Sequence, residues 1–218
     1  MVADTTYNPP AGMDAGRDPP PTGRWLAAAF FPALLVAGGI VVVKGGNRDA
    51  VAAALKASAR WSYLWFWGAY AGGALAAVFG ARFQALARRG RSLGLAFAAA
   101  QTVHAGLVLS LYVGPFEPPG TRTLAIFGPA LALTYLIAAL SFTRVAAPIP
   151  PAVVRAIRLV AVEYIAFVFL LDFAKNPFSG GWFQLLAYLP FQVLVVAGLG
   201  LRIMAYARQR AAPRASAA

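Results

Sequence analysis

The sequence predicts an all-α polytopic membrane protein: a bundle of six transmembrane helices with both termini in the cytoplasm. Hydrophobic residues make up 60% of the 218 residues and charged residues only 12%, whereas about 25% of a soluble domain is charged. The apolar residues form long blocks and do not recur with the period of an amphipathic helix or strand. Arginines and lysines lie between these blocks, as they do at the flanks of membrane spans.

The formal net charge of +12 and the lack of cysteine limit the binding partners and the kinds of metal site that we expect. A strongly basic domain is typical of nucleic-acid binding, but here the basic residues flank apolar blocks, so we expect the partner to be the lipid bilayer and not nucleic acid. Without cysteine there are no disulfides, iron–sulfur clusters or thiolate metal sites.

The two ends of the chain differ from the middle. Residues 1–24 are rich in proline, glycine and aspartate, and such a segment cannot bury a core, so we expect it to be disordered. It lacks the basic start and immediate apolar run of a signal peptide. Residues 207–218 are small and basic and are also expected to be disordered. The transmembrane domain is therefore predicted to cover residues 25–206.

Six segments are long enough to cross a bilayer core about 30 Å thick, which takes about 20 helical residues. They are Trp25–Val43, Trp61–Ala81, Ser92–Val113, Thr123–Thr143, Val153–Phe173 and Trp182–Leu201. The fifth segment is unusual because it contains the ionisable residues Arg155, Arg158, Glu163 and Asp172. Before the second segment, Asn47–Arg60 begins with a helix start signal, and we expect it to be a short interfacial helix on the outer side.

Basic residues predict the orientation of these segments. Thirteen of the 19 arginines and lysines fall on the side that holds both termini when six helices are threaded through the membrane. Cytoplasmic flanks carry such an excess. We therefore expect a multi-pass protein of a bacterial-type inner membrane, with both termini in the cytoplasm.

Ionisable side chains within membrane spans are functional candidates. His104, the only histidine, lies 12 residues into the third segment, about 18 Å deep. Glu163 lies 10 residues past the start of the fifth, about 15 Å deep. Either the two pair inside the bundle, or Glu163 reaches Arg158 or Arg155 and His104 bonds a carbonyl. Gln101, three residues before His104, is expected to form a hydrogen bond within the bundle.

Two stretches suggest a family. "RSLGLAFAAAQTVH" (Arg91–His104) and "SARWSYLWFWGAYAGGALAAVFG" (Ser58–Gly80) resemble the third and second helices of the ferric reductase-like transmembrane family. The similarity is greatest to its branch of haem-binding membrane subunits of periplasmic methionine sulfoxide reductase systems. The resemblance covers roughly residues 25–208, and it implies a six-helix fold with cytoplasmic termini.

The resemblance also implies a cofactor. Members of the family hold b-type haem between histidines of the third and fifth helices, which makes His104 the candidate axial ligand. This chain has no second histidine, so a bis-histidine haem within one chain is excluded. Tyrosine can ligate haem, and Tyr164 on the fifth segment is the weaker candidate. Haem on His104 alone, haem shared between two chains and loss of haem all stay open.

Three functions follow as alternatives. The chain is an electron-transfer subunit that passes electrons to a periplasmic or membrane redox partner; or a haem-free descendant that serves as a scaffold; or a small proton-coupled transporter with Glu163 and His104 at its site. No self-contained catalytic constellation is visible in the sequence. Any enzymatic role would be that of an oxidoreductase subunit.

Overall fold

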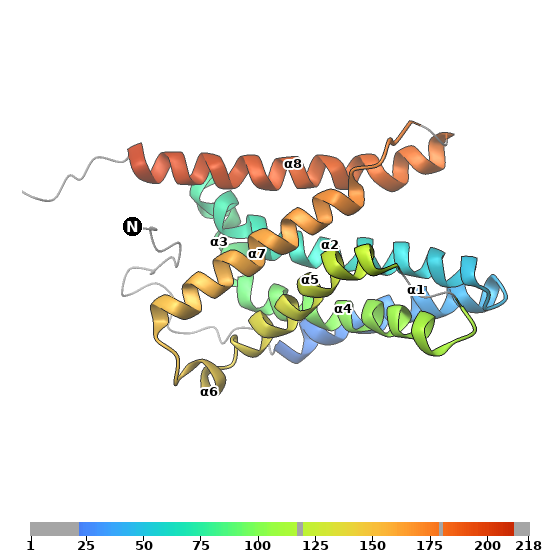
Figure 1. Cartoon of the computed structure of the whole chain (residues 1–218). Helices are drawn as coiled ribbons and strands as arrows, with labels where there is room; N and C mark the ends of the chain where they lie inside the picture. Colours follow the sequence, from blue (N-terminus) through green and yellow to red (C-terminus); the bar gives the residue numbers. More distant parts are fainter. Residues whose placement is uncertain (1–21, 117–119, 179–180, 212–218) are drawn as a thin grey trace, which may run out of the picture.

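The computed structural model describes residues 22–116, 120–178 and 181–211, and every regular element within these ranges is helical (Figure 1). The prediction of an all-α fold is confirmed. The helices are α1 (Thr22–Val43), α2 (Arg48–Phe79), the 3₁₀ turn η1 (Ala81–Phe83), α3 (Gln84–Arg88), α4 (Gly90–Val113), α5 (Thr121–Ala139), α6 (Thr143–Ala146), α7 (Pro151–Phe173) and α8 (Gly181–Ala211).

Four of the described helices, α1, α4, α5 and α8, are long and apolar enough to cross a membrane. By length and composition these four helices are candidate membrane spans of a multi-pass helical protein. Helix α7 contains four ionisable residues, and α2 begins with a charged stretch. The six-span bundle stays a prediction. So does disorder of the tails, because residues 1–21 and 212–218 lie outside the described residues. Helix α8 runs to Ala211, five residues past the expected boundary at 206.

The separate interfacial helix expected at Asn47–Arg60 is wrong, because this segment is the first part of α2. Asn47 caps the helix as predicted, accepting a hydrogen bond on Oδ1 from the Ala50 amide at 2.8 Å. No glycine or proline separates Arg60 from the apolar stretch that follows, so the helical hydrogen bonds continue without a break. The 32 residues of α2 span about 48 Å, and the helix ends at Gly80, whose φ of 79° suits glycine.

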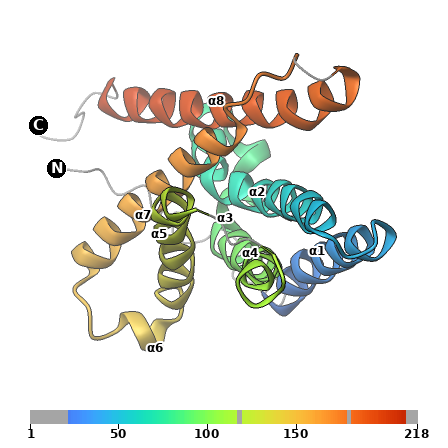
Figure 2. The same ribbon diagram turned by 45° about the vertical axis from the view of Figure 1, so that its right-hand side comes forward.

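Helices α1, α2 and α4 pack together through small side chains (Figure 2). Alanines spaced four residues apart are fully or almost fully buried in both α1 and α4. They are Ala29, Ala33 and Ala37 on α1 and Ala96 and Ala100 on α4. Four-residue spacing of small residues places them on one helix face and lets backbones approach closely in a membrane. The Trp61 indole Nε1 donates to the Ala29 carbonyl at 2.7 Å and links α2 to α1.

Aromatic rings join α7 to α2 and α4. Phe169 of α7 lies with its ring centroid 4.8 Å from that of Tyr63 and 5.4 Å from that of Phe66, both on α2. Its ring is also 6.1 Å from that of Phe97 on α4. Such rings bury large apolar areas in preferred tilted or edge-on geometries. The main core of the molecule is therefore aromatic and lies where α2, α4 and α7 meet.

Helix α8 lies parallel to α2 along much of its length (Figures 1 and 2). Trp67 Nε1 donates to the Leu194 carbonyl at 2.7 Å, and Arg60 Nε donates to the Ala187 carbonyl at 2.9 Å. Both pairs are separated by 127 positions in sequence, so the two helices keep one register. This register sets the height at which side chains of α8 meet α2.

The start of α1 and the last turns of α8 lie at the same end of the molecule. The guanidinium carbon of Arg89, just before α4, is 5.4 Å from the ring centroid of Trp25 at the start of α1. At the end of α8, Arg208 donates to the Val78 carbonyl, close to the end of α2, at 2.6 Å. Which side of a membrane this end faces stays a prediction.

Candidate functional site

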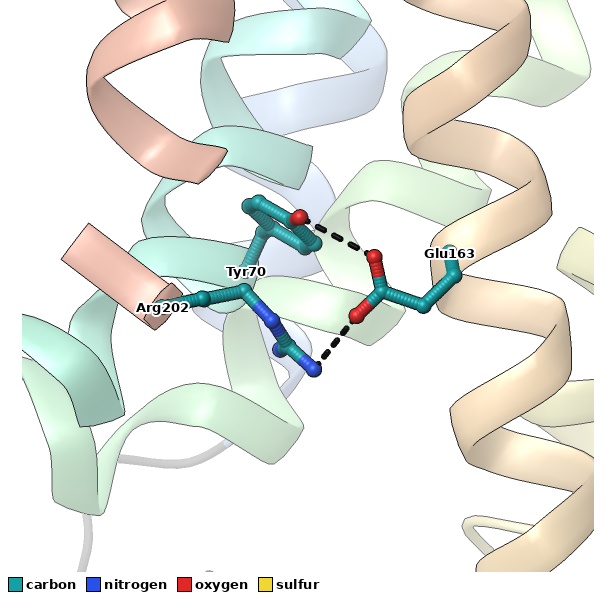
Figure 3. Close-up of polar contacts among 3 residues, drawn as sticks. All are labelled: Tyr70, Glu163 and Arg202. Atoms are coloured by element: carbon teal, nitrogen blue, oxygen red, sulfur yellow. Dashed lines mark hydrogen bonds and ion pairs between the residues drawn. The ribbon is translucent and has the colours of Figure 1, made fainter. Parts of the chain in front are cut away.

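Glu163 lies near the middle of α7 and is bound by side chains of two other helices (Figure 3). Its Oε1 atom is 2.6 Å from a guanidinium nitrogen of Arg202 on α8. Its Oε2 atom accepts a hydrogen bond from the Tyr70 hydroxyl on α2 at 3.1 Å. One carboxylate therefore joins α7 to α8 and α2, far along the sequence from both partners.

Packing around Tyr70 fixes the position of Arg202. The guanidinium carbon of Arg202 lies 4.6 Å from the Tyr70 ring centroid, within the range of a cation–π contact. One turn earlier on α8, a Cβ atom on Gly198 would lie 3.1 Å from Trp67 Nε1 and 3.3 Å from the Tyr70 ring. The glycine thus allows α8 to approach α2 closely enough for Arg202 to reach both the ring and the carboxylate.

The two side chains of the ion pair are partly exposed. The side chain of Glu163 is 42% exposed and that of Arg202 is 30% exposed. A cavity of about 210 Å³ borders the carboxylate and the Tyr70 ring. Its other walls are apolar and come from α2, α7 and α8: Tyr63, Phe66, Ala166, Phe167, Leu170, Val195 and Leu199. The arrangement places one ionisable acid, with a cation beside it, on the wall of a small apolar space.

The first of the two alternatives, a pairing of His104 with Glu163, is wrong. His104 Nδ1 instead lies 3.0 Å from the hydroxyl oxygen of Ser58 on α2. Ser58 and Tyr70, the α2 partners of the two residues, are 12 positions apart on one helix, which is about 18 Å. The predicted depths assumed that the two spans begin at the same height in the membrane, but α4 and α7 begin at different heights. The two groups therefore lie at different heights.

In the second alternative Glu163 reaches Arg158 or Arg155. This is wrong for Arg158, which donates to the Leu140 carbonyl near the end of α5 at 2.6 Å. The cation beside Glu163 is Arg202, which directly follows the predicted span Trp182–Leu201. Gly198 and Gly200 come just before Arg202 in the sequence, and glycine is a common helix stop signal, so no local signal placed Arg202 inside the last helix. Nothing in the sequence around Tyr70 indicates that its hydroxyl would contact Glu163.

Gln101 does not form the expected hydrogen bond through its carbonyl oxygen. That Oε1 atom is buried and accepts no hydrogen bond from the described residues. On helix α2 the indole Nε1 of Trp65 is also buried, and it donates no hydrogen bond to the described residues. Gln101 lies one turn after Phe97 on α4 and does not line the cavity beside Glu163.

The two candidate haem ligands point to different helices. The Tyr164 hydroxyl donates to the Ile126 carbonyl on α5 at 3.0 Å, whereas His104 is paired with Ser58 on α2. Neither residue lines the cavity beside Glu163. Two axial ligands must face one iron from opposite sides, so this pair does not fit a haem held between them.

Comparisons with models of protein families, with curated proteins and with solved structures find no match to this chain. Within the described residues, no three His, Asp or Glu side chains lie together as a metal site. The geometry of the site is that of an acid bound by an arginine and a tyrosine, among helices of which four are long and apolar enough to cross a membrane.

Proposed function

We propose that this protein is a small proton-coupled membrane transporter whose proton-accepting group is Glu163. The observation that supports the proposal is the binding of the Glu163 carboxylate, halfway along α7, by Arg202 of α8 and Tyr70 of α2. With α7 as a membrane span, as the sequence predicts, Glu163 is an ionisable residue within the membrane, and such residues are rare and costly and mark proton or substrate pathways. The scaffold alternative gives this acid no role.

The chemistry of the cluster supports coupling between a proton and helix position. The ionised carboxylate accepts from both Arg202 and Tyr70. Protonation removes the negative charge and leaves the Arg202 guanidinium without its counter-ion in a half-buried position, which is unfavourable. The protein then prefers an arrangement in which Arg202 is solvated elsewhere. Because the two protonation states favour different arrangements of α7 and α8, proton uptake shifts their populations.

The cavity beside Glu163 gives a place for a solute. Its volume of about 210 Å³ lies a little below the range of about 300–1,000 Å³ for drug-sized ligands, so the transported solute is small. In this proposal His104 and Ser58 belong to the packing of α2 against α4 and not to the transport site. The protein lies in a bacterial-type inner membrane, with its arginine-rich end in the cytoplasm.

Transport assays in liposomes test this function. Wild-type protein is reconstituted with a pH-sensitive dye inside, and inward gradients of small neutral, cationic and anionic solutes are applied in turn. We expect one solute class to move protons with it, and Glu163→Gln to abolish that proton movement. Asp49→Asn, which removes an exposed acid at the start of α2, is the matched control and should transport normally. Solute-driven proton movement that is unchanged in Glu163→Gln would contradict the proposal.

A further inference from the structure

A second hollow lies on the opposite side of α2 from the Glu163 site, between α1 and α4. It is a groove of about 600 Å³, within the range of small-molecule sites. Its α1 wall runs from Phe30 to Val42, a rise of about 18 Å. One leaflet of a bilayer core is about 15 Å thick. We propose that this groove binds one acyl chain of a phospholipid, with the phosphate of the headgroup at Lys44.

The position of the groove favours lipid. Both of its walls, α1 and α4, are among the helices that are long and apolar enough to cross a membrane. Leu34 and Val42 line it and are still strongly exposed, so no other described part of the chain covers them. A surface of this kind at this depth meets hydrocarbon in a bilayer.

The chemistry of the walls also favours a hydrocarbon chain. Among the described residues that line the groove, only two carry hydroxyl groups, Thr102 and Ser110, both on α4. Each donates to a carbonyl of its own helix: Thr102 to Ala98 at 3.1 Å, and Ser110 to Leu107 at 2.7 Å. Their donors are already used, so the groove offers an occupant an apolar surface.

Two glycines on facing walls create the hollow. Gly38 of α1 and Gly106 of α4 both line the groove. A Cβ atom built on either one would meet no other atom within 4 Å. A side chain at either position would therefore extend into the groove without displacing the backbone, which gives a way to fill the groove and leave the fold intact.

A basic residue at one end of the groove selects phospholipid over a second copy of this chain. Lys44 is exposed and follows α1 directly, between the lining residues Val42 and Gly46. An acyl chain in the groove would place its headgroup near this end, where the membrane surface lies, and an ammonium group attracts a phosphate there. The apolar groove and the terminal cation together match an apolar tail with an anionic head.

Photolabelling in vesicles tests the site. The full chain is reconstituted in phosphatidylglycerol vesicles that contain a trace of phosphatidylglycerol with a diazirine in the middle of one acyl chain. After illumination, labelled peptides are quantified by mass spectrometry. We expect label to concentrate on the groove walls of α1 and α4. Gly38→Leu and Gly106→Leu should each lower this labelling about tenfold, since the leucine displaces methylenes of the lipid. Lys44→Gln should lower it a few-fold.

Gly39→Leu is the matched control, because Gly39 is the next residue of α1, also has open space at its Cβ, and does not line the groove. It should label like the wild type, and far-ultraviolet circular dichroism should be the same for all variants. Equal labelling in Gly38→Leu and Gly39→Leu would overturn the proposal. Label spread evenly over the exposed faces of α5 and α8 would overturn it as well, and so would cross-linked dimers joined through the groove.

Discussion

Helices α1, α2 and α4 are joined by buried alanines, whereas α7 is joined to its neighbours by aromatic rings and one ion pair. Figure 2 shows the two regions, with α5 and α7 set to one side of α1, α2 and α4. Small side chains hold backbones close and contain no group whose charge changes. An ion pair loses its attraction when the acid is protonated. The difference therefore places the movement proposed for protonation of Glu163 at α7, while the alanine contacts among α1, α2 and α4, which form an alanine-packed frame, stay in place.

The largest effect is expected in the aromatic core that attaches α7. Replacing Phe169, which contacts the rings of Tyr63, Phe66 and Phe97, by alanine removes a buried ring and leaves a cavity. We expect a loss of about 3–5 kcal/mol in reversible unfolding in detergent micelles. Phe167→Ala, two residues away and exposed, is the control and should change little. Equal losses would show that α7 is not attached through this core.

A smaller loss is expected in the alanine-packed frame. Ala29 is fully buried between α1 and its neighbours, and leucine at this position must push the helices apart. Overpacking of this kind costs about 1–3 kcal/mol, measured by the same unfolding assay. The adjacent Ala28 is exposed, so Ala28→Leu serves as the control. If Ala29→Leu were neutral, close packing of α1 would not hold the frame.

The ion pair is expected to contribute less than either core. Arg202→Gln and Glu163→Gln, separately and together, form a double-mutant cycle for the 2.6 Å contact. Polar contacts between membrane helices average about 0.6 kcal/mol in such cycles, and partial exposure of both groups argues against a much larger value. The coupling energy should vanish in acid, where Glu163 is protonated. A coupling energy that persists in acid would count against the role given to the carboxylate.

The smallest effect is expected at the histidine. Ser58→Ala removes the side-chain partner of His104 Nδ1 but leaves the packing of α2 against α4 in place. The loss should not exceed about 0.6 kcal/mol in the unfolding assay. Ser110→Ala removes a hydroxyl that bonds only within α4 and is the control. A loss of several kcal/mol at Ser58 would mean that His104 has a structural role beyond one hydrogen bond.

The helices could be predicted from the sequence because long apolar runs leave few alternatives to a helix in a membrane. The partners of Glu163 could not. Pairing depends on the relative height and tilt of helices, and the basic residue that pairs with Glu163 looked like an ordinary flanking charge. The continuation of α2 past Arg60 was missed for a different reason: Asn47 correctly signalled a helix start, but the charged and apolar parts were taken as two helices although no glycine or proline separates them.

The most direct test of the central claim is a distance between α7 and α8 measured as a function of pH. The chain has no cysteine, so Val160→Cys on α7 and Ile203→Cys on α8, both exposed, can be spin-labelled without other changes. Pulsed electron–electron double resonance in vesicles should show that the distribution of distances between the two spin labels shifts on acidification. The same pair in Glu163→Gln should give the acid distribution at every pH. Distributions that are independent of pH, or the same in the two proteins, would contradict the account.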